Sequence, residues 1–215
     1  MTLARSIVVA VCALLMAPEQ PTPARYVSGE LPAVPVQTIG GGQVFVELAV
    51  TAAGSVAGAT ILRATPPFTD AVVSALQGWR FEPARDTDDP KEPLHDVAST
   101  VLVAAIFRPP TLLNGPVAGT PPTDVGTASI TTPLPGSIVA PAFPAKAIAS
   151  GLVLVEADVA STGAVADARV IVSAPGFDEP ALNAARQWTF RPARLHGRAV
   201  PSVVYLLFGF RQPVT

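Results

Sequence analysis

Two heptapeptides of the same pattern constrain the fold of this chain more than any other feature. They are Trp79-Arg-Phe-Glu-Pro-Ala-Arg85 and Trp188-Thr-Phe-Arg-Pro-Ala-Arg194, and they contain the only two tryptophans of the sequence. With the 109-residue shift that superposes Trp79 on Trp188, the ranges 32–85 and 141–194 align without a gap. We therefore predict an internal duplication, in which one supersecondary unit is used twice.

Within each copy, the spacing of apolar residues predicts two strands joined by a tight turn. Apolar residues alternate at 44–50 and again at 153–159, which is typical of a strand with one buried face. Ala53-Gly54 and Thr162-Gly163 follow them as turn signals, because glycine adopts positive φ at little cost. Second strands are expected at 56–64 and 165–174.

A helix and a third strand are expected next. Thr69 and Asp178 are suitable N-cap residues, and apolar side chains then recur at every third position up to each tryptophan. Pro83 and Pro192 prevent the helix from continuing. The last strands are expected at 97–107 and 200–210.

The order strand, strand, helix, strand predicts an α+β fold built from two tandem two-layer units. In each unit, one helix packs on a three-stranded antiparallel sheet. The predicted domains are a signal peptide at 1–24, a first unit at 29–108 and a second unit at 137–212. Residues 109–136 are rich in Pro, Gly and Thr and show no sustained period, so they are interpreted as a linker.

The N-terminus predicts export. Arg5 precedes an apolar run at 6–17, which is shorter than the roughly 20 residues of a membrane span and suits a signal peptide. Ala17 and Ala24 are the two candidate cleavage positions, and an uncleaved membrane anchor is the alternative. Cys12 is the only cysteine and lies in this run, so the mature chain is expected to have no thiol.

Composition and motifs argue against several classes of function. The formal net charge of −2 supplies no positive field for nucleic acid or for an anionic membrane surface. Gly40–Gly42 is not followed by the Lys-Ser/Thr of a phosphate loop, and no Gly-x-Ser-x-Gly is present. We therefore predict no enzyme activity, no cofactor, no metal and no small-molecule substrate, and we interpret Trp79 and Trp188 as core residues.

Taken together, the residues of each unit resemble the C-terminal domain of TonB, the periplasmic energy transducer of Gram-negative bacteria. The resemblance covers 32–107 and 141–210. It is clearest in the second unit, where the matching stretches are Phe143-Pro144, Gly151–Val159, Ser161–Val165, Trp188–Pro192 and Arg194–Val200.

The chain departs from TonB in three ways. Its N-terminal run is short and has no histidine, and residues 18–28 are too few for TonB's long periplasmic spacer. The residues before Phe143 and Val34 also lack the glutamine that the family associates with receptor contact. The resemblance therefore implies the fold but not the energising role.

The family's mode of binding implies β-strand addition, in which an extended peptide joins an exposed sheet edge. The implied partner is an outer-membrane receptor or another envelope protein, and the implied location is the periplasm. The predicted edge is the last strand of the second unit, with two arginines on its approach: Val203, Val204, Tyr205, Leu206, Leu207, Phe208, Arg191 and Arg194. Two alternatives remain: the edge is covered by the other unit or the linker, or the chain is a structural module that forms a homodimer through its edges.

Overall fold

The computed structural model describes residues 20–34, 40–87, 89, 91–109, 115–121, 129–145, 147 and 149–212. Most of the predicted signal peptide (1–24) lies outside these residues. The two helices are α1 (Phe68–Leu76) and α2 (Asp178–Ala185). The strands are β1 (Arg25–Ser28), β2 (Gly42–Val50), β3 (Val56–Arg63), β4 (Arg80–Glu82), β5 (Ala84–Asp86), β6 (His95–Val97), β7 (Ser99–Phe107), β8 (Val117–Gly119), β9 (Leu134–Ala140), β10 (Gly151–Val159), β11 (Val165–Val172), β12 (Thr189–Arg191), β13 (Arg194–Leu195), β14 (Arg198–Ala199) and β15 (Ser202–Phe210).

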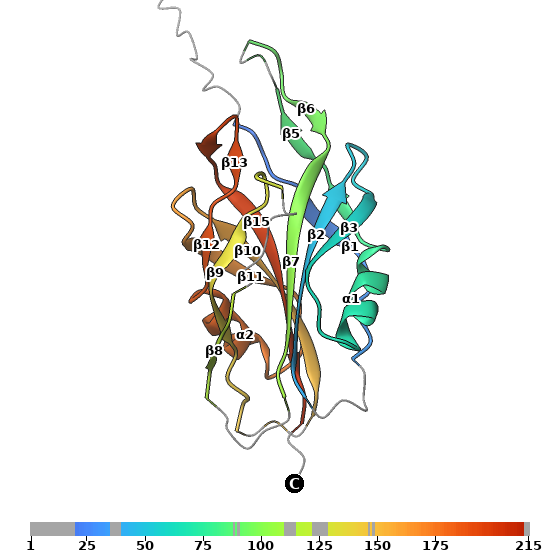
Figure 1. Ribbon diagram of the computed structural model, residues 1–215, viewed down its shortest axis with the longest axis vertical. Helices are drawn as coiled ribbons and strands as arrows, with labels where there is room; N and C mark the ends of the chain where they lie inside the picture. The colour runs from blue at the N-terminus through green and yellow to red at the C-terminus, as the bar shows by residue number, and fades with distance from the viewer. Residues whose placement is uncertain are drawn as a thin grey trace, which may run out of the picture.

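A six-stranded sheet forms the centre of the molecule, in the order β11-β10-β15-β7-β2-β3 (Figure 1). Neighbouring strands are antiparallel except at the middle, where β7 and β15 run parallel. The predicted α+β class is confirmed. The chain does not contain two separate three-stranded sheets, however, because β3-β2-β7 and β11-β10-β15 are joined through this parallel pair into one.

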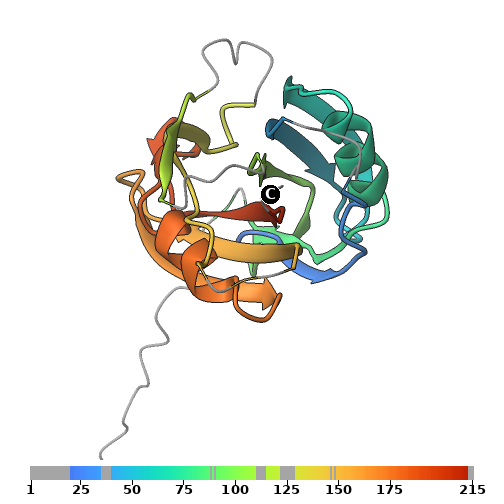
Figure 2. The same ribbon diagram turned by 90° about the horizontal axis from the view of Figure 1, so that it is seen from below.

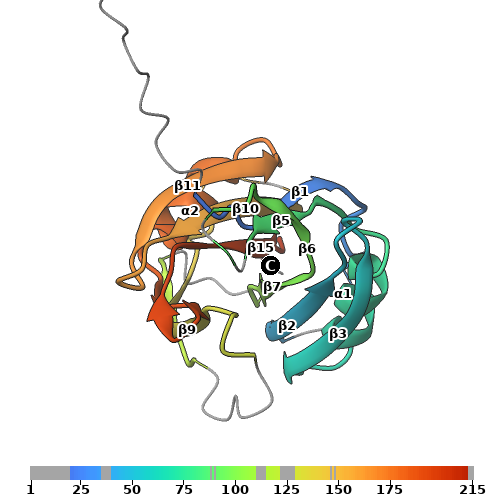
Figure 3. The same ribbon diagram turned by 90° about the horizontal axis from the view of Figure 1, so that it is seen from above.

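The two helices pack on opposite faces of the sheet. One core contains Phe68, Val72 and Leu76 of α1, and the other contains Ala181, Ala184 and Ala185 of α2. End-on views show α1 beside β2 and β3, α2 beside β10 and β11, and the parallel pair between them (Figures 2 and 3). A parallel join between two similar halves produces this arrangement, because a half-turn about the strand direction exchanges the faces.

The central strands are buried on both faces. Along β7, Leu102 and Ala104 contribute to the core under α2, whereas Val101 and Val103 contribute to the core under α1. The alternation in β15 is the same, so its whole length from Val203 to Phe210 is buried. Burial on both faces explains why these two segments are almost continuously apolar instead of alternating with polar residues.

Each tryptophan anchors the corner between its helix and the next strand. Trp79 and Trp188 are 0% and 1% exposed, which confirms their interpretation as core residues. The indole Nε1–H of Trp79 donates to the Glu30 carbonyl at 3.0 Å, and that of Trp188 donates to the Val139 carbonyl at 2.9 Å. Both acceptors lie 49 residues before their tryptophan. Each corner is thus tied to the segment that enters its half of the sheet.

The hairpin turn and the corner also require each other. Phe81 donates its N–H to the Gly54 carbonyl at 2.8 Å, and Phe190 donates to Gly163 at 2.7 Å. Both glycines have positive φ, 76° and 88°, and a Cβ on either would lie within 1.9 Å of the phenylalanine carbonyl oxygen. Only glycine fits this close approach, as the turn signals in the sequence predict.

The helix starts differ from the expected N-caps. The residues preceding α1 and α2 are Pro67 and Phe177, and neither caps its helix with a side chain. Thr69 and Asp178 lie inside the first turn, and their side-chain oxygens accept the N–H of Thr65 and Ala174, at 2.8 and 2.9 Å. They therefore fix the loop that leads into the helix rather than cap it.

The segments before each half are structured as well. β1 pairs with β4, and β9 pairs with β12 in the same way. Part of the predicted linker 109–136 therefore forms β8 and the start of β9. The end predicted for the signal peptide also falls within the fold, because Ala24 is buried and Thr22 exchanges two backbone hydrogen bonds with Arg85. A chain cut after Ala24 would lose both contacts.

Among the described residues, no helix has the length and apolar character needed to cross a membrane.

Candidate functional site

The predicted binding edge is not an edge. β15 pairs with β10 along its whole length on one side and with β7 on the other, from Val204 opposite Leu102 to Gly209 opposite Phe107. Its main-chain groups are therefore used on both sides, and the side chains at 203–208 are buried. The prediction of an open edge at Val203, Val204, Tyr205, Leu206, Leu207 and Phe208 is wrong; the alternative of a covered edge describes what the structure shows.

The two arginines predicted on the approach to that strand lie in short ladders outside the central sheet. Arg191 is exposed on β12, where it pairs with Leu134. Arg194 is exposed on β13, where its N–H donates to the Ile130 carbonyl at 2.9 Å and its guanidinium donates to the Gly197 carbonyl. No open strand edge of the central sheet lies in either ladder.

The edges of the central sheet are β3 and β11, which end the strand order on opposite sides. Both pair with one neighbour only, among the strands that the structure describes. The register slips near both ends of each strand, which leaves Ala57 and Leu62 unpaired in β3 and Ala166 and Ile171 unpaired in β11. Such bulges confine the regular part of each edge to the residues between them.

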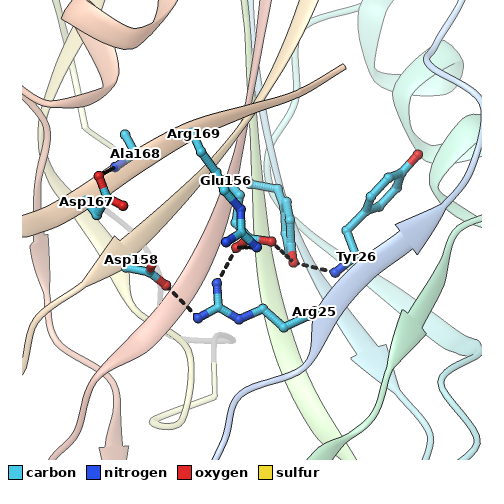
Figure 4. Close-up of polar contacts among 8 residues, drawn as sticks. Arg25, Tyr26, Glu156, Asp158, Asp167, Ala168 and Arg169 are labelled. Atoms are coloured by element: carbon cyan, nitrogen blue, oxygen red, sulfur yellow. Dashed lines mark hydrogen bonds and ion pairs between the residues drawn. The ribbon is translucent and has the colours of Figure 1, made fainter. Parts of the chain in front are cut away.

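The edge at β11 is closed by its own side chains. The N–H of Ala168 donates to the carboxylate of the preceding Asp167 at 2.8 Å (Figure 4). This N–H is therefore directed away from β10, and it is already satisfied. The next residue of β11, Arg169, forms an ion pair with Glu156 of β10 at 2.6 Å. Charged side chains and satisfied donors are how natural sheets keep other strands off their edges.

The edge at β3 lacks this protection. With Trp79 superposed on Trp188, Gly58 stands opposite Asp167 and Thr60 opposite Arg169. Ala59 pairs with Leu48 in the register at which Ala168 pairs with Ala157, so its N–H also faces the open side. No described side chain accepts a hydrogen bond from it. The five residues Ala57–Ile61 are all exposed and uncharged.

An ion-pair network around the buried Glu156 lies at the β11 side of the sheet (Figure 4). Glu156, 2% exposed, contacts the guanidinium groups of Arg25 and Arg169 through Oε1 and accepts the Tyr205 hydroxyl at 3.0 Å through Oε2. Arg25 also pairs with Asp158 at 2.9 Å. The ion pairs of Arg25 with Glu156 and Asp158 hold β1 against β10. β1 therefore covers this face of the sheet.

Arg25 and Tyr205 have perturbed pKa values in this network. Burial alone would lower the pKa of the Arg25 guanidinium, but Glu156 and Asp158 outweigh it and raise that pKa. Burial also raises the pKa of the Tyr205 hydroxyl, and the negative charge of Glu156 raises it further. The hydroxyl accepts the N–H of Tyr26 at 2.6 Å, and the pKa of Tyr26 is itself raised by burial.

A spectroscopic titration tests this environment, because Tyr26 and Tyr205 are the only tyrosines. Both native pKa values lie above the usual value of about 10, so folding favours the neutral phenols. Their contribution to stability is complete below about pH 10 and is lost as the pH rises beyond it, when the unfolded chain ionises first. We expect tyrosinate absorbance at 295 nm to appear together with loss of circular dichroism. Absorbance that rises near pH 10 in a folded protein would contradict the network.

A cavity of about 480 Å³ lies where β3 ends and β2 begins. Arg63, the last residue of β3, lines it and extends over the ring of Phe45. The acceptors of its guanidinium within the described part of the chain are neutral: the Gln43 side-chain oxygen and the carbonyls of Thr120 and Pro121. Arg63 forms no ion pair with any described residue. The wall also includes the buried Arg108, whose pKa is lowered by desolvation.

The sequence contained two indications of this site that the predictions did not use. The apolar runs of β7 and β15 lack alternation, which indicates burial on both faces and so excludes an open edge at β15. In the alignment of the two units, the charged residues Asp167 and Arg169 of β11 also correspond to the uncharged Gly58 and Thr60 of β3. What the sequence could not supply is the parallel pairing of β7 with β15, because nothing local encodes which strands meet.

One comparison with known proteins gave a match. Residues 139–211 match the family model described as Gram-negative bacterial TonB protein C-terminal. The match supports the predicted family resemblance for one copy, the second unit. No curated protein and no solved structure was found to match the chain.

Proposed function

We propose, from the TonB C-terminal character of residues 139–211, that this chain is an exported, non-enzymatic protein of the periplasm. It binds an envelope protein by adding that partner's extended segment to an outer edge of its six-stranded sheet, in connection with TonB-dependent transport across the outer membrane. The open outer edge of the sheet carries this proposal, because main-chain donors and acceptors on such an edge bind an extended peptide with few demands on its sequence.

We further propose that residues 29–108 form a second unit of the same type. Three equivalences support it. The order strand, strand, helix, strand recurs along the chain, β1·β4 corresponds to β9·β12, and each tryptophan donates to a carbonyl at the same separation. The parallel pairing of β7 with β15 then uses the last strand of both units. The strands that remain open to a partner are the outer ones, β3 and β11.

The alternative function is a structural module whose edges join copies of the chain into a homodimer. The exposed, uncharged residues Ala57–Ile61 of the edge strand β3 support this alternative, since unprotected edges also pair with one another. The two functions differ in one measurable respect. Self-association through an edge competes with peptide binding, so the mass in solution should fall when a binding peptide is added.

Affinity capture from a Gram-negative envelope fraction tests the proposed function. The full chain is immobilised, bound envelope proteins are crosslinked, and the crosslinks are mapped by mass spectrometry. We expect an envelope protein to be retained and its crosslinks to fall at the outer strands rather than at 203–208. Retention no greater than on a resin without bait, or crosslinks confined to other surfaces, would show that the proposed function is wrong.

A further inference from the structure

We infer that β3, and not β11, is the edge that receives the partner, and that the occupant is an extended segment with an acidic residue beside Arg63. This inference rests on the proposed function and names its binding strand and one feature of its partner. It depends on three observations: the state of one main-chain N–H on each edge, the charges along the two strands, and the cation at the end of β3.

The main-chain N–H groups of Ala59 and Ala168 separate the two edges. Ala168 donates to Asp167, so a strand that approached β11 would have to displace a charge-assisted hydrogen bond before forming its own. Ala59 follows Gly58, which has no side chain to accept its N–H. A partner carbonyl at β3 therefore satisfies a donor for which the described residues supply no side-chain acceptor, and this difference favours β3.

The side chains of the two edge strands also favour β3 over β11 as the binding edge. Asp167 and Arg169 place charges on the open strand of one edge, where an incoming apolar residue would desolvate them. The corresponding Gly58 and Thr60 are small and uncharged, and a Cβ built on Gly58 meets no atom within 4 Å. The face of β3 at Gly58 is therefore open, so a side chain of the partner strand can lie over it without a clash.

The length of the added strand follows from the bulges. Regular pairing of β3 with β2 extends from Gly58 to Ile61, between the unpaired Ala57 and Leu62. An edge of this length binds a short segment, and its affinity then depends on a side-chain contact at one end. Arg63 supplies that contact, because it follows the unpaired Leu62 at the end of the regular segment and lines the cavity of about 480 Å³.

Charge complementarity identifies the occupant. Among the described residues, the guanidinium of Arg63 has only neutral acceptors, so a partner carboxylate placed in the cavity would gain a charge-assisted hydrogen bond. A second copy of β3 cannot supply this group, because Val56–Arg63 contains no Asp or Glu. The edge therefore suits an acidic segment of a different protein better than a β3–β3 pairing of two copies.

The test uses peptides and a matched pair of substitutions at Gly58. The probes are fluorescently labelled peptides of about eight residues that alternate Thr and Val, a length that covers the open edge. Each has one Glu at its N-terminal or C-terminal end, so that both strand directions are sampled, and each has a counterpart with Gln. Gly58→Asp should supply the cap that Asp167 gives to β11, whereas Gly58→Ala adds a Cβ without an acceptor.

We expect one of the Glu peptides to bind the full chain, with affinity at least about tenfold weaker for Gly58→Asp and within about twofold for Gly58→Ala. Asp167→Ala should uncap β11 and add a second binding event. Arg63→Gln should abolish the preference for Glu over Gln without abolishing binding.

Four results would overturn the inference: no binding of any peptide at millimolar concentration, equal binding by Gly58→Asp and the native chain, loss of binding with Asp167→Ala alone, or a dimer that Gly58→Asp dissociates. If envelope capture persists with Gly58→Asp, the proposed function stands and only the assignment of the edge fails.

Discussion

Trp188→Ala is expected to destabilise the protein by about 3–5 kcal/mol, the usual cost of removing a large aromatic side chain from a core. Trp188 is 1% exposed and contacts Phe45, Phe190 and Phe208 at ring-centroid distances of 6.0–6.4 Å. Its removal leaves a cavity among side chains from both halves of the sheet, since Phe45 belongs to β2. Urea denaturation followed by circular dichroism measures the change.

Trp188→Phe provides the control, because it keeps a ring in the core but removes the hydrogen bond to the Val139 carbonyl. We expect it to cost less than Trp188→Ala, with a part of about 0.5–1.5 kcal/mol for the lost hydrogen bond to the part-buried carbonyl. Trp79→Ala should have an effect of the same size, because Trp79 makes the equivalent bond to Glu30. An effect below about 1 kcal/mol for either alanine variant would contradict the structural role given to the corner.

Glu156→Gln is expected to destabilise the protein by about 2 kcal/mol. Breaking a fully buried ion pair by removing one partner costs about 3–5 kcal/mol. The cost should be lower here, because the side chains of Arg25 and Arg169 are 33% and 58% exposed and water solvates them when their partner is neutral. Chemical denaturation at neutral pH measures the loss.

Two substitutions separate the network from the general effect of a buried carboxylate. Glu47 stands opposite Glu156 in the sequence alignment, but among the described residues its side chain accepts only the Ser129 N–H, at 2.8 Å. Glu47→Gln keeps an oxygen that can accept this N–H, so it should cost less than about 1 kcal/mol. Asp158→Asn removes a half-exposed partner of Arg25 and should cost less than about 1 kcal/mol. Equal losses for Glu47→Gln and Glu156→Gln would refute the network's contribution.

Most of the local structure could be predicted from the sequence, because local chemistry determines it. The heptapeptides predicted the helix-to-strand corners, and Gly54 and Gly163 predicted the hairpins that the structure shows. The N-caps were misassigned because Thr69 and Asp178 have the right chemistry one or two residues too late, where they bond to the loop before the helix. Propensity alone does not distinguish these two uses of a side-chain oxygen.

The assembly of the sheet and the edge could not be predicted in the same way. Whether β15 lies at an edge depends on β7, a strand about 100 residues away in sequence, and pattern rules place no constraint on that pairing. β3 and β11 were predicted as strands, but their exposure as edges follows only from the sheet order. The sequence shows that Gly58 corresponds to Asp167, but only the structure shows that the Asp167 carboxylate accepts the Ala168 N–H and so protects the β11 edge.

The parallel pair at the centre of the sheet has a consequence for how the chain is made. Among the described strands β15 comes last in sequence, yet it lies between β10 and β7, and Val204 pairs with Leu102. A chain synthesised from its N-terminus therefore holds β7 and β10 with bare apolar edges until β15 has been made and is free to fold. Contacts of such long range slow folding and expose intermediates to aggregation. Holding the chain unfolded until β15 has been made suits this topology, and a chain that lacks β15 would lose the strand that joins the two halves.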